Sequence, residues 1–177
     1  MTNQKLYVNV WIGNLGKYNE GELVGEWFSL PCDMKEVSEK IGLNEQYEEY
    51  QINDFDTNIK GLEIHHYDNI STLNEFAEQL EKLDDNEQLV LQAWIEQYGT
   101  SNLFQELDSI NFDDARIYYE VENMTDIAYE VIEEGGMLNG VNETLARYFD
   151  YEAFGRDLGI EGTYVFLDNK ICVELLG

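Results

Sequence analysis

Negative charge along the whole chain constrains this protein more than any other feature of its sequence. The 177 residues include 37 Asp and Glu against 10 Lys and Arg, which gives a formal net charge of -27. Such a surface repels nucleic acids and anionic membranes, attracts basic partners, and destabilises the compact state by self-repulsion. Four purposes would justify the charge: solubility, adaptation to high salt, cation binding, or recognition of a basic protein surface.

The acidic residues are spread through the chain and do not form a tail. Residues 1–60 contain 11 acids and 5 bases, residues 61–110 contain 11 acids and one base, and residues 111–177 contain 15 acids and 4 bases. Hydrophobic residues make up 44% of the sequence and aromatic residues 13%. This composition is sufficient for a hydrophobic core, so we predict that the charge lies on folded surface.

Hydrophobic periodicity predicts an α+β fold of three small domains. In residues 1–62, apolar patterns predict strands at 5–13, 22–30 and 50–55, with a short helix before the last of them. We assign these residues to an N-terminal α+β domain.

The remaining residues form the other two expected domains. Three short helices, of which residues 71–83 are the clearest, define a central helical domain at residues 63–110. Residues 111–177 combine a strand at 115–122, helices, and a two-residue hairpin turn at 168–169. We assign them to a C-terminal α+β domain. The expected N-caps of the helices include Asp33, Ser71, Thr125 and Asn142.

Motifs for metal binding and catalysis are weak. Residues 54–58 have the alternating acids of an EF-hand loop, but Ile59 and His65 replace the glycine and the final glutamate that calcium binding requires. His65 and His66 are neighbours, which point to opposite faces of a strand. We therefore expect no metal, no cofactor and no catalytic residue. Pairs of carboxylates for hydrolysis occur in any acidic protein, so an enzyme is the least favoured class.

The sequence also bears on the compartment. No apolar run approaches the ~18 residues of a membrane span, and residues 1–10 lack the regions of a secretory signal. Cys32 and Cys172 are too few for a disulfide framework. We expect a cytoplasmic protein with reduced cysteines.

Four stretches resemble the ArdA family of antirestriction proteins, which conjugative elements and phages carry. Residues 14–28 are similar to the opening hairpin of that family, and residues 41–50 resemble the segment that follows it. Residues 128–138 match the place of its acidic antirestriction stretch, and residues 149–158 resemble its C-terminal signature. The stretches keep the order of the family, so the resemblance spans the chain.

The resemblance implies a DNA mimic that occupies the DNA-binding groove of type I restriction-modification enzymes. It would block cleavage of incoming DNA, and whether it also blocks methylation stays open. The resemblance further implies an elongated homodimer of three-domain chains joined through their C-terminal domains. Independently, 27 net charges correspond to ~46 Å of DNA duplex at ~1.7 Å per charge.

We predict that the mimic surface consists of the outward acids of the middle and C-terminal helices. These are Glu75, Glu78, Asp84, Asp85, Glu87, Glu96, Glu106, Asp113, Asp114, Glu130, Glu133 and Glu134. For the dimer interface we predict apolar side chains of residues 115–140, which exceed what a domain of this size needs to bury: Ile117, Tyr118, Tyr119, Val121, Met137 and Leu138. For each tyrosine the alternative is packing in the core of its own chain.

Two other hypotheses explain the charge. An acidic inhibitor of a different basic nucleic-acid-binding protein would have the same composition. A solubility-driven or halophilic surface fits less well, because 7 of the 10 bases are lysines, which halophilic surfaces tend to replace by acids.

Overall fold

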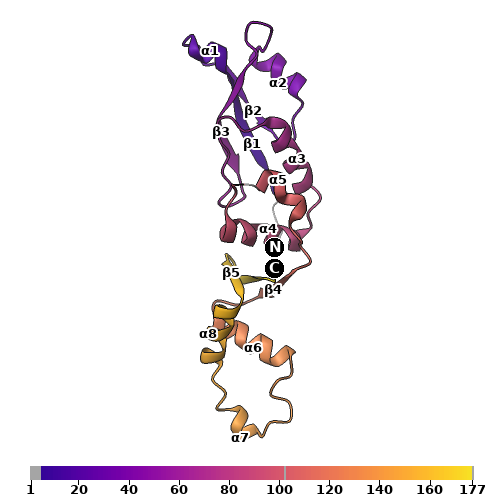
Figure 1. Ribbon diagram of the computed structural model, residues 1–177, viewed down its shortest axis with the longest axis vertical. Helices are drawn as coiled ribbons and strands as arrows, with labels where there is room; N and C mark the ends of the chain where they lie inside the picture. The colour runs from indigo at the N-terminus through magenta and orange to yellow at the C-terminus, as the bar shows by residue number, and fades with distance from the viewer. Residues whose placement is uncertain (1–4, 102, 177) are drawn as a thin grey trace. The chain divides into compact units, whose positions relative to one another are not determined.

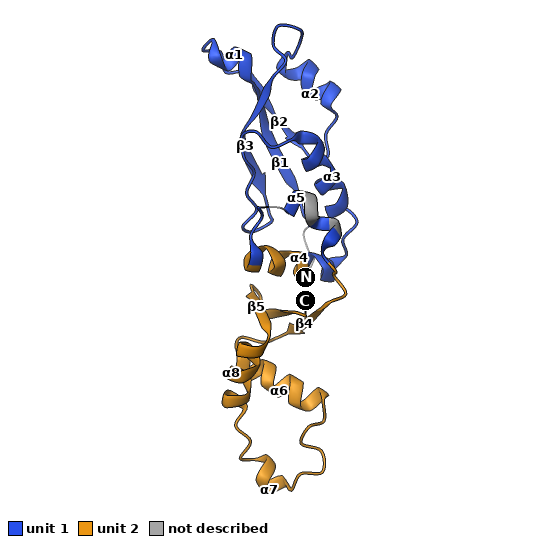
Figure 2. Ribbon diagram, in the orientation of Figure 1, with its two compact units in different colours: residues 1–88, 98–110 blue, residues 89–97, 111–177 orange. Residues whose placement is uncertain are grey.

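The computed structural model describes residues 5–101 and 103–176, and of residues 105, 106 and 108 it describes the backbone only. It confirms an α+β fold, with two three-stranded antiparallel sheets and several helices (Figure 1). By internal contacts the chain separates into two compact units (Figure 2). Unit 1 is residues 1–88 and 98–110, and unit 2 is residues 89–97 and 111–177. The three-domain division stays a prediction.

Unit 1 contains the first sheet, in the order β2-β1-β3, together with short helices. Helix α4 (Asp85–Tyr98) has residues in both units. The other elements of unit 1 are β1 (Val8–Asn14), α1 (Leu15–Asn19), β2 (Gly25–Ser29), α2 (Met34–Ile41), β3 (Tyr50–Thr57), α3 (Ile70–Leu80), α5 (Leu103–Glu106) and the 3-10 helix η1 (Leu107–Ser109).

One face of the first sheet forms the core of unit 1. Val8, Val10 and Ile12 alternate along β1 and are buried on this face. Helix α2 contacts β1 and β2, and Val37 and Ile41 are its buried residues. The alternating residues of β1 and the helically spaced residues of α2 therefore belong to one core, as both periodicities predict.

The side chain of Asn14 forms hydrogen bonds with both the start of α1 and the end of α2. Its buried side chain accepts a hydrogen bond from the backbone N–H of Lys17 at 3.0 Å and caps α1, a short helix between the first two predicted strands that the apolar pattern did not predict. Its Nδ2 donates to the carbonyl oxygens of Ile41 and Gly42 at 3.1 and 3.2 Å. A polar residue buried in this way is stable because its hydrogen bonds are made.

The helix starts agree with the predicted N-caps at two of four positions. Asp33 caps α2, and Asn142 caps the short helix α7 (Glu143–Ala146), as predicted. For the helices predicted to begin at Ser71 and Thr125, the caps are instead Asn69 and Asn123. Asparagine is as good an N-cap as serine or threonine, so local composition allowed either start.

Unit 2 contains the second sheet, in the order β4-β6-β5. Its hairpin has a three-residue connection between β5 and β6, rather than the predicted two, with positive φ at Asn169 and Lys170. Its elements besides α4 are β4 (Ala115–Tyr119), α6 (Met124–Glu134), α7 (Glu143–Ala146), α8 (Tyr151–Glu161), β5 (Thr163–Leu167) and β6 (Ile171–Leu175).

Both faces of the second sheet are covered. On one face, Val90 and Ala93 of α4 pack with Val165 and Val173. On the other face, Tyr118 and Cys172 pack with residues of α6 and α8. Strands enclosed in this way need apolar residues on both sides, which explains the nearly continuous hydrophobic runs of β5 and β6.

Helix α8 was not predicted from the sequence, because two glycines interrupt its apolar pattern. Gly155 is buried where α8 packs on the start of α6, and a Cβ there would lie 2.8 Å from the carbonyl carbon of Met124. The missing side chain allows the two helices to approach closely. In the described part of the chain, no helix is long and apolar enough to span a bilayer.

Candidate functional site

Both compact units have a large excess of acids. Unit 1 contains 21 acids and 6 bases, a net charge of -15, and unit 2 contains 16 acids and 4 bases, a net charge of -12. The excess is therefore not a property of one region. Six of the predicted acids belong to each unit.

On α3 of unit 1, the acids point away from the core. Leu73, Phe76 and Leu80 are buried on one side, whereas Glu75 and Glu78 are exposed. The i, i+3, i+4, i+7 spacing of the apolar residues leaves the other positions to solvent. This part of the predicted surface has the exposure that binding requires.

The acids that precede and begin α4 have a local structural role that the sequence reasoning missed. Oδ1 of Asp84 accepts hydrogen bonds from the backbone N–H groups of Asn86 and Glu87, both at 2.9 Å. Oε2 of Glu87 accepts one from the backbone N–H of Asp84 at 2.8 Å. This reciprocal pair is a capping box, whose sequence signal is an Asp followed three residues later by a Glu. Asp85 beside it is exposed.

Three further predicted acids lie near the end of α4 and just before β4. Glu96 on α4 is exposed, as are Asp113 and Asp114 in the turn before β4. Oδ2 of Asp114 accepts a hydrogen bond from Nδ2 of Asn111 at 2.7 Å. The side chain of Glu106 lies outside the described residues.

The acids of α6 lie close enough together for Glu130 to be affected by the charges of its neighbours. Burial, and next the charge of Glu134, raise the pKa of Glu130 above its usual value, with smaller contributions from Asp126 and Glu133. Glu133 and Glu134 are exposed in the last turn, which contains no base. Carboxylates at a helix C-terminus oppose the helix dipole. The sequence thus keeps a charge cluster that local stability disfavours.

The described ion pairs engage other carboxylates. Lys40 bridges Glu26 and Glu36, at 3.3 and 3.1 Å. Lys170 pairs with Glu122 at 2.7 Å. Each of these carboxylates lies outside the predicted set, so these bases do not neutralise the candidate surface.

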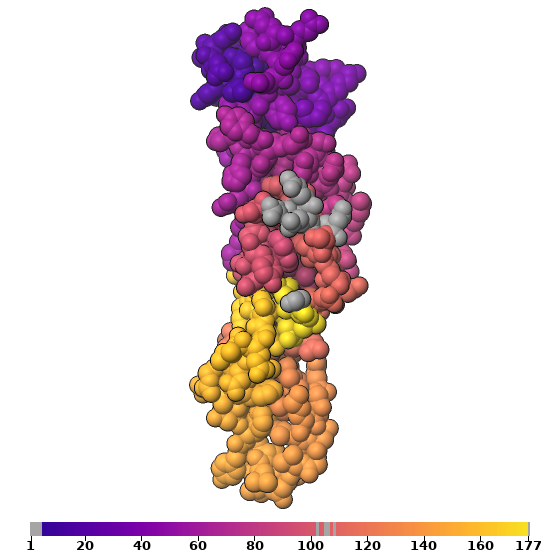
Figure 3. Space-filling model, viewed as in Figure 1, coloured from indigo at the N-terminus to yellow at the C-terminus, as the bar shows by residue number. Residues whose placement is uncertain are grey.

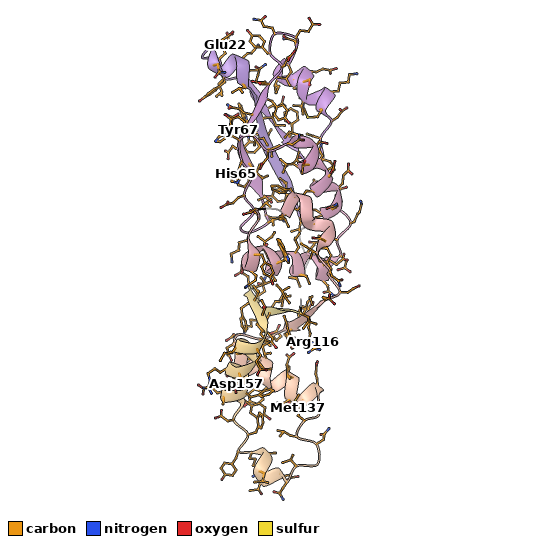
Figure 4. All side chains as sticks on the ribbon, viewed as in Figure 1. Glu22, His65, Tyr67, Arg116, Met137 and Asp157 are labelled. Carbon is orange, nitrogen blue, oxygen red and sulfur yellow. The ribbon has the colours of Figure 1, made fainter. Side chains whose placement is uncertain are left out.

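The predicted interface residues separate into buried and exposed ones. Tyr118 and Val121 are 2% exposed and belong to the core of unit 2. Ile117 packs against the cluster of Val165 and Val173 on the other face of the sheet. Leu138 is half-buried, whereas Tyr119 is 50% and Met137 55% exposed. Figure 4 labels Met137 just after the end of α6.

Tyr118 also belongs to a polar network that the sequence did not reveal. Its hydroxyl donates to Oε2 of Glu174 at 2.9 Å, and the hydroxyl of Tyr164 donates to Oε1 at 2.7 Å. Arg116 donates to the hydroxyl of Tyr118 at 3.3 Å. The register of β4, β6 and β5 sets Arg116, Glu174 and Tyr164 side by side, so only the strand pairing could have identified the network.

The weak metal motifs have ordinary structural roles. Residues 54–57 of the EF-hand-like stretch lie in β3. Nδ1 of His66 lies 2.7 Å from the carbonyl oxygen of Ile52. Among the described residues, no group of three or more His, Cys, Asp or Glu side chains is arranged to hold a metal ion.

Comparison with known proteins identifies the family. No curated protein matches the chain. The family model of the antirestriction protein ArdA matches residues 10–173, which is nearly all of the chain and covers most of both compact units. It is an inhibitor family whose function implies interaction with restriction-modification enzymes. The chain therefore belongs to the ArdA family of antirestriction proteins.

Proposed function

We propose that this protein is a DNA mimic that occupies the DNA-binding groove of a type I restriction-modification enzyme and blocks cleavage of incoming DNA. The observation that supports it most is the acidic cluster of α6, where Glu130, Glu133 and Glu134 are retained against self-repulsion and the helix dipole. A charge that weakens the fold needs a purpose outside the fold. A groove that binds phosphates offers one, because its bases attract a dense array of carboxylates.

The binding energy of a mimic is spread over many carboxylates. Neutralising any one exposed acid should therefore cost about 1 kcal/mol or less, as for other exposed charges. Neutralising six acids of unit 2 together should weaken inhibition far more and flatten its dependence on salt. The six changes are to the amides at Glu96, Asp113, Asp114, Glu130, Glu133 and Glu134.

A variant with the same change in net charge provides the control. It neutralises six exposed acids of unit 1 that lie outside the predicted set: Glu22, Glu39, Glu45, Glu48, Glu49 and Glu63. Inhibition of DNA cleavage by a purified type I enzyme is measured for both variants over a range of salt concentrations. Equal losses would show that net charge alone matters. Loss of inhibition after one acid-to-amide change, with the fold intact, would contradict the distributed mechanism.

We further infer that two chains associate through unit 2. Large apolar side chains are exposed there, among them Tyr119, Met137, Leu145, Tyr148 and Ile160. Figure 1 shows α7 in the long connection between α6 and α8, away from the second sheet, and Figure 3 shows openings beside this orange segment. A loop that exposes apolar groups without packing them is typical of an interaction surface.

The dimer is tested by light scattering at micromolar concentration. Tyr119→Asp and Met137→Asp should shift the protein to monomer while its thermal transition remains. Tyr118→Asp places a charge in the core of unit 2 and should abolish the transition instead. A wild-type protein that is monomeric under these conditions would overturn the dimer.

A further inference from the structure

One face of the first sheet carries exposed side chains among the described residues. Opposite the buried Val8, Val10 and Ile12, the register of the strands sets two rows of side chains across the sheet. One row is Ser29, Asn9 and Asp56, and the other is Trp27, Trp11 and Asp54. Trp27, Ser29, Asp54 and Asp56 are exposed, and Asn9 and Trp11 are half-buried. Aromatic rings and carboxylates thus share one surface.

Trp11 lies flat on this face because two glycines make room for its ring. A Cβ on Gly13 would lie 2.7 Å from Cζ3 of Trp11, and a Cβ on Gly25 would overlap the same ring. The indole therefore covers the backbone of its own strand and of β2. An aromatic ring held in this way is ordered before any partner binds, which lowers the entropy lost on binding.

A pocket opens beside Trp27, the cross-strand neighbour of Trp11. It has a volume of about 360 Å³ and is lined by Asn9, Trp27, Phe28, Ser29 and Asp56. Oγ of Ser29 donates to Oδ1 of Asn9 at 2.7 Å, and Nδ2 of Asn9 donates to Oδ2 of Asp56 at 3.4 Å. These hydrogen bonds orient the polar side of the pocket, while Trp27, 46% exposed, forms its aromatic side.

The chemistry of the lining selects a planar cation. The described lining residues include one carboxylate and one exposed indole, and none of them is positively charged. A guanidinium stacks on an aromatic ring and donates two parallel hydrogen bonds to a carboxylate. An ammonium group is a compact, strongly hydrated charge that does neither as well.

We propose that this pocket binds an arginine side chain of a protein partner, with the guanidinium stacked on Trp27 and hydrogen-bonded to Asp56. The proposal deepens the proposed function and depends on it for the partner, because a DNA-binding groove presents arginines that normally contact phosphates. It adds a specific contact to the distributed attraction of the other acids.

The pocket is tested directly with the probe N-acetyl-arginine amide. Two-dimensional ¹H–¹⁵N NMR spectra follow the indole N–H of Trp27, assigned with the variant Trp27→Phe. The arginine compound should shift this signal in a saturable way. N-acetyl-citrulline amide, its uncharged analogue, should not shift it, and N-acetyl-lysine amide should bind about threefold or more weakly.

Asp56→Asn and Asp54→Asn form a matched pair, since both remove one exposed charge from β3 and only Asp56 lines the pocket. Asp56→Asn should weaken the arginine compound about tenfold, and Asp54→Asn less than about twofold. Equal effects of the two variants, equal binding of the citrulline compound, or no saturable shift would overturn the pocket. Their spectra also report whether each variant is folded.

Inhibition of a type I enzyme separates this proposal from the proposed function. If the wild-type protein inhibits, Asp56→Asn should require about tenfold more protein for half inhibition, and Asp54→Asn about the wild-type amount. Identical inhibition by both variants would overturn the role of the pocket in binding that enzyme. If the wild-type protein does not inhibit, the proposed function is wrong, and the arginine titration still decides whether the pocket binds a guanidinium.

Discussion

The two sheets of this protein have three antiparallel strands each, yet their surroundings differ. The sheet of unit 1 buries one face and leaves Trp27, Asp54 and Asp56 exposed on the other. The sheet of unit 2 is covered on both faces, by α4 on one side and by α6 and α8 on the other. An open face is available for recognition, whereas the polar groups of an enclosed face have to satisfy each other.

The pKa values reflect this enclosure. Burial raises the pKa of Tyr118 to about 12, and burial also raises that of Cys172 to about 12. Burial and next the hydrogen bond to Glu174 raise the pKa of Tyr164. All three residues lie on strands of the second sheet, so the difference between the two sheets can be tested through their titration.

The largest expected effect is a loss of stability at alkaline pH. An unfolded chain releases the protons of Cys172 and Tyr118 near pH 9 and 10, whereas the folded chain holds them to about 12. Their contribution is therefore complete below about pH 9 and is lost as the pH rises toward 12, with a loss on the order of 4 kcal/mol at pH 11. Urea unfolding followed by circular dichroism at pH 8 and 11 measures the loss. An unchanged midpoint would contradict the enclosure of the second sheet.

The next effect concerns the helices that cover this sheet. Gly155→Ala places a methyl group against the backbone of Met124 and should destabilise the protein by about 1–3 kcal/mol. Gly159→Ala is the matched control, because its nearest neighbour is the flexible Met124 side chain at 3.3 Å. The control should change stability by less than about 1 kcal/mol. Equal effects in urea unfolding would show that close packing of α6 and α8 is unimportant.

Removing one hydroxyl from the network should have a smaller effect. Tyr118→Phe removes a donor to Glu174, whose side chain is only 13% exposed, and leaves part of that carboxylate unsatisfied. We expect a cost of about 1–2 kcal/mol. Tyr67→Phe in unit 1, at a side chain that is 80% exposed, should cost almost nothing. If thermal unfolding showed a similar loss of stability for both variants, the hydroxyl of Tyr118 would be no more important for stability than an exposed hydroxyl of unit 1.

The smallest effect has the opposite sign. Glu130→Gln removes a charge that is disfavoured by burial and by Glu134, and should stabilise the protein by about 0.5 kcal/mol. Glu78→Gln, at an exposed position of α3, is the comparison in unit 1. Since salt screens charge repulsion, the gain at Glu130 should shrink at high ionic strength. A gain that does not respond to salt would assign the effect to burial alone.

The sequence by itself determined the family, the α+β class and most of the helices and strands. Apolar spacing placed α3, and Asp33 marked the start of α2, because capping and periodicity are local properties. The exposure of Glu75 and Glu78 also followed from spacing on one helix. The net charge also followed from the sequence, since counting charged residues requires no knowledge of the structure.

Tertiary structure decided which residues meet. Helix α8 forms despite its glycines because Gly155 permits close packing on α6, a contact between segments that the sequence separates. The sequence left open whether Tyr118 lies in an interface or in the core. The packing of α6 against its face of the sheet places it in the core. The Trp27–Asp56 pocket needs the pairing of three strands. Such features depend on register and on close approach between distant segments, which periodicity along one segment does not specify.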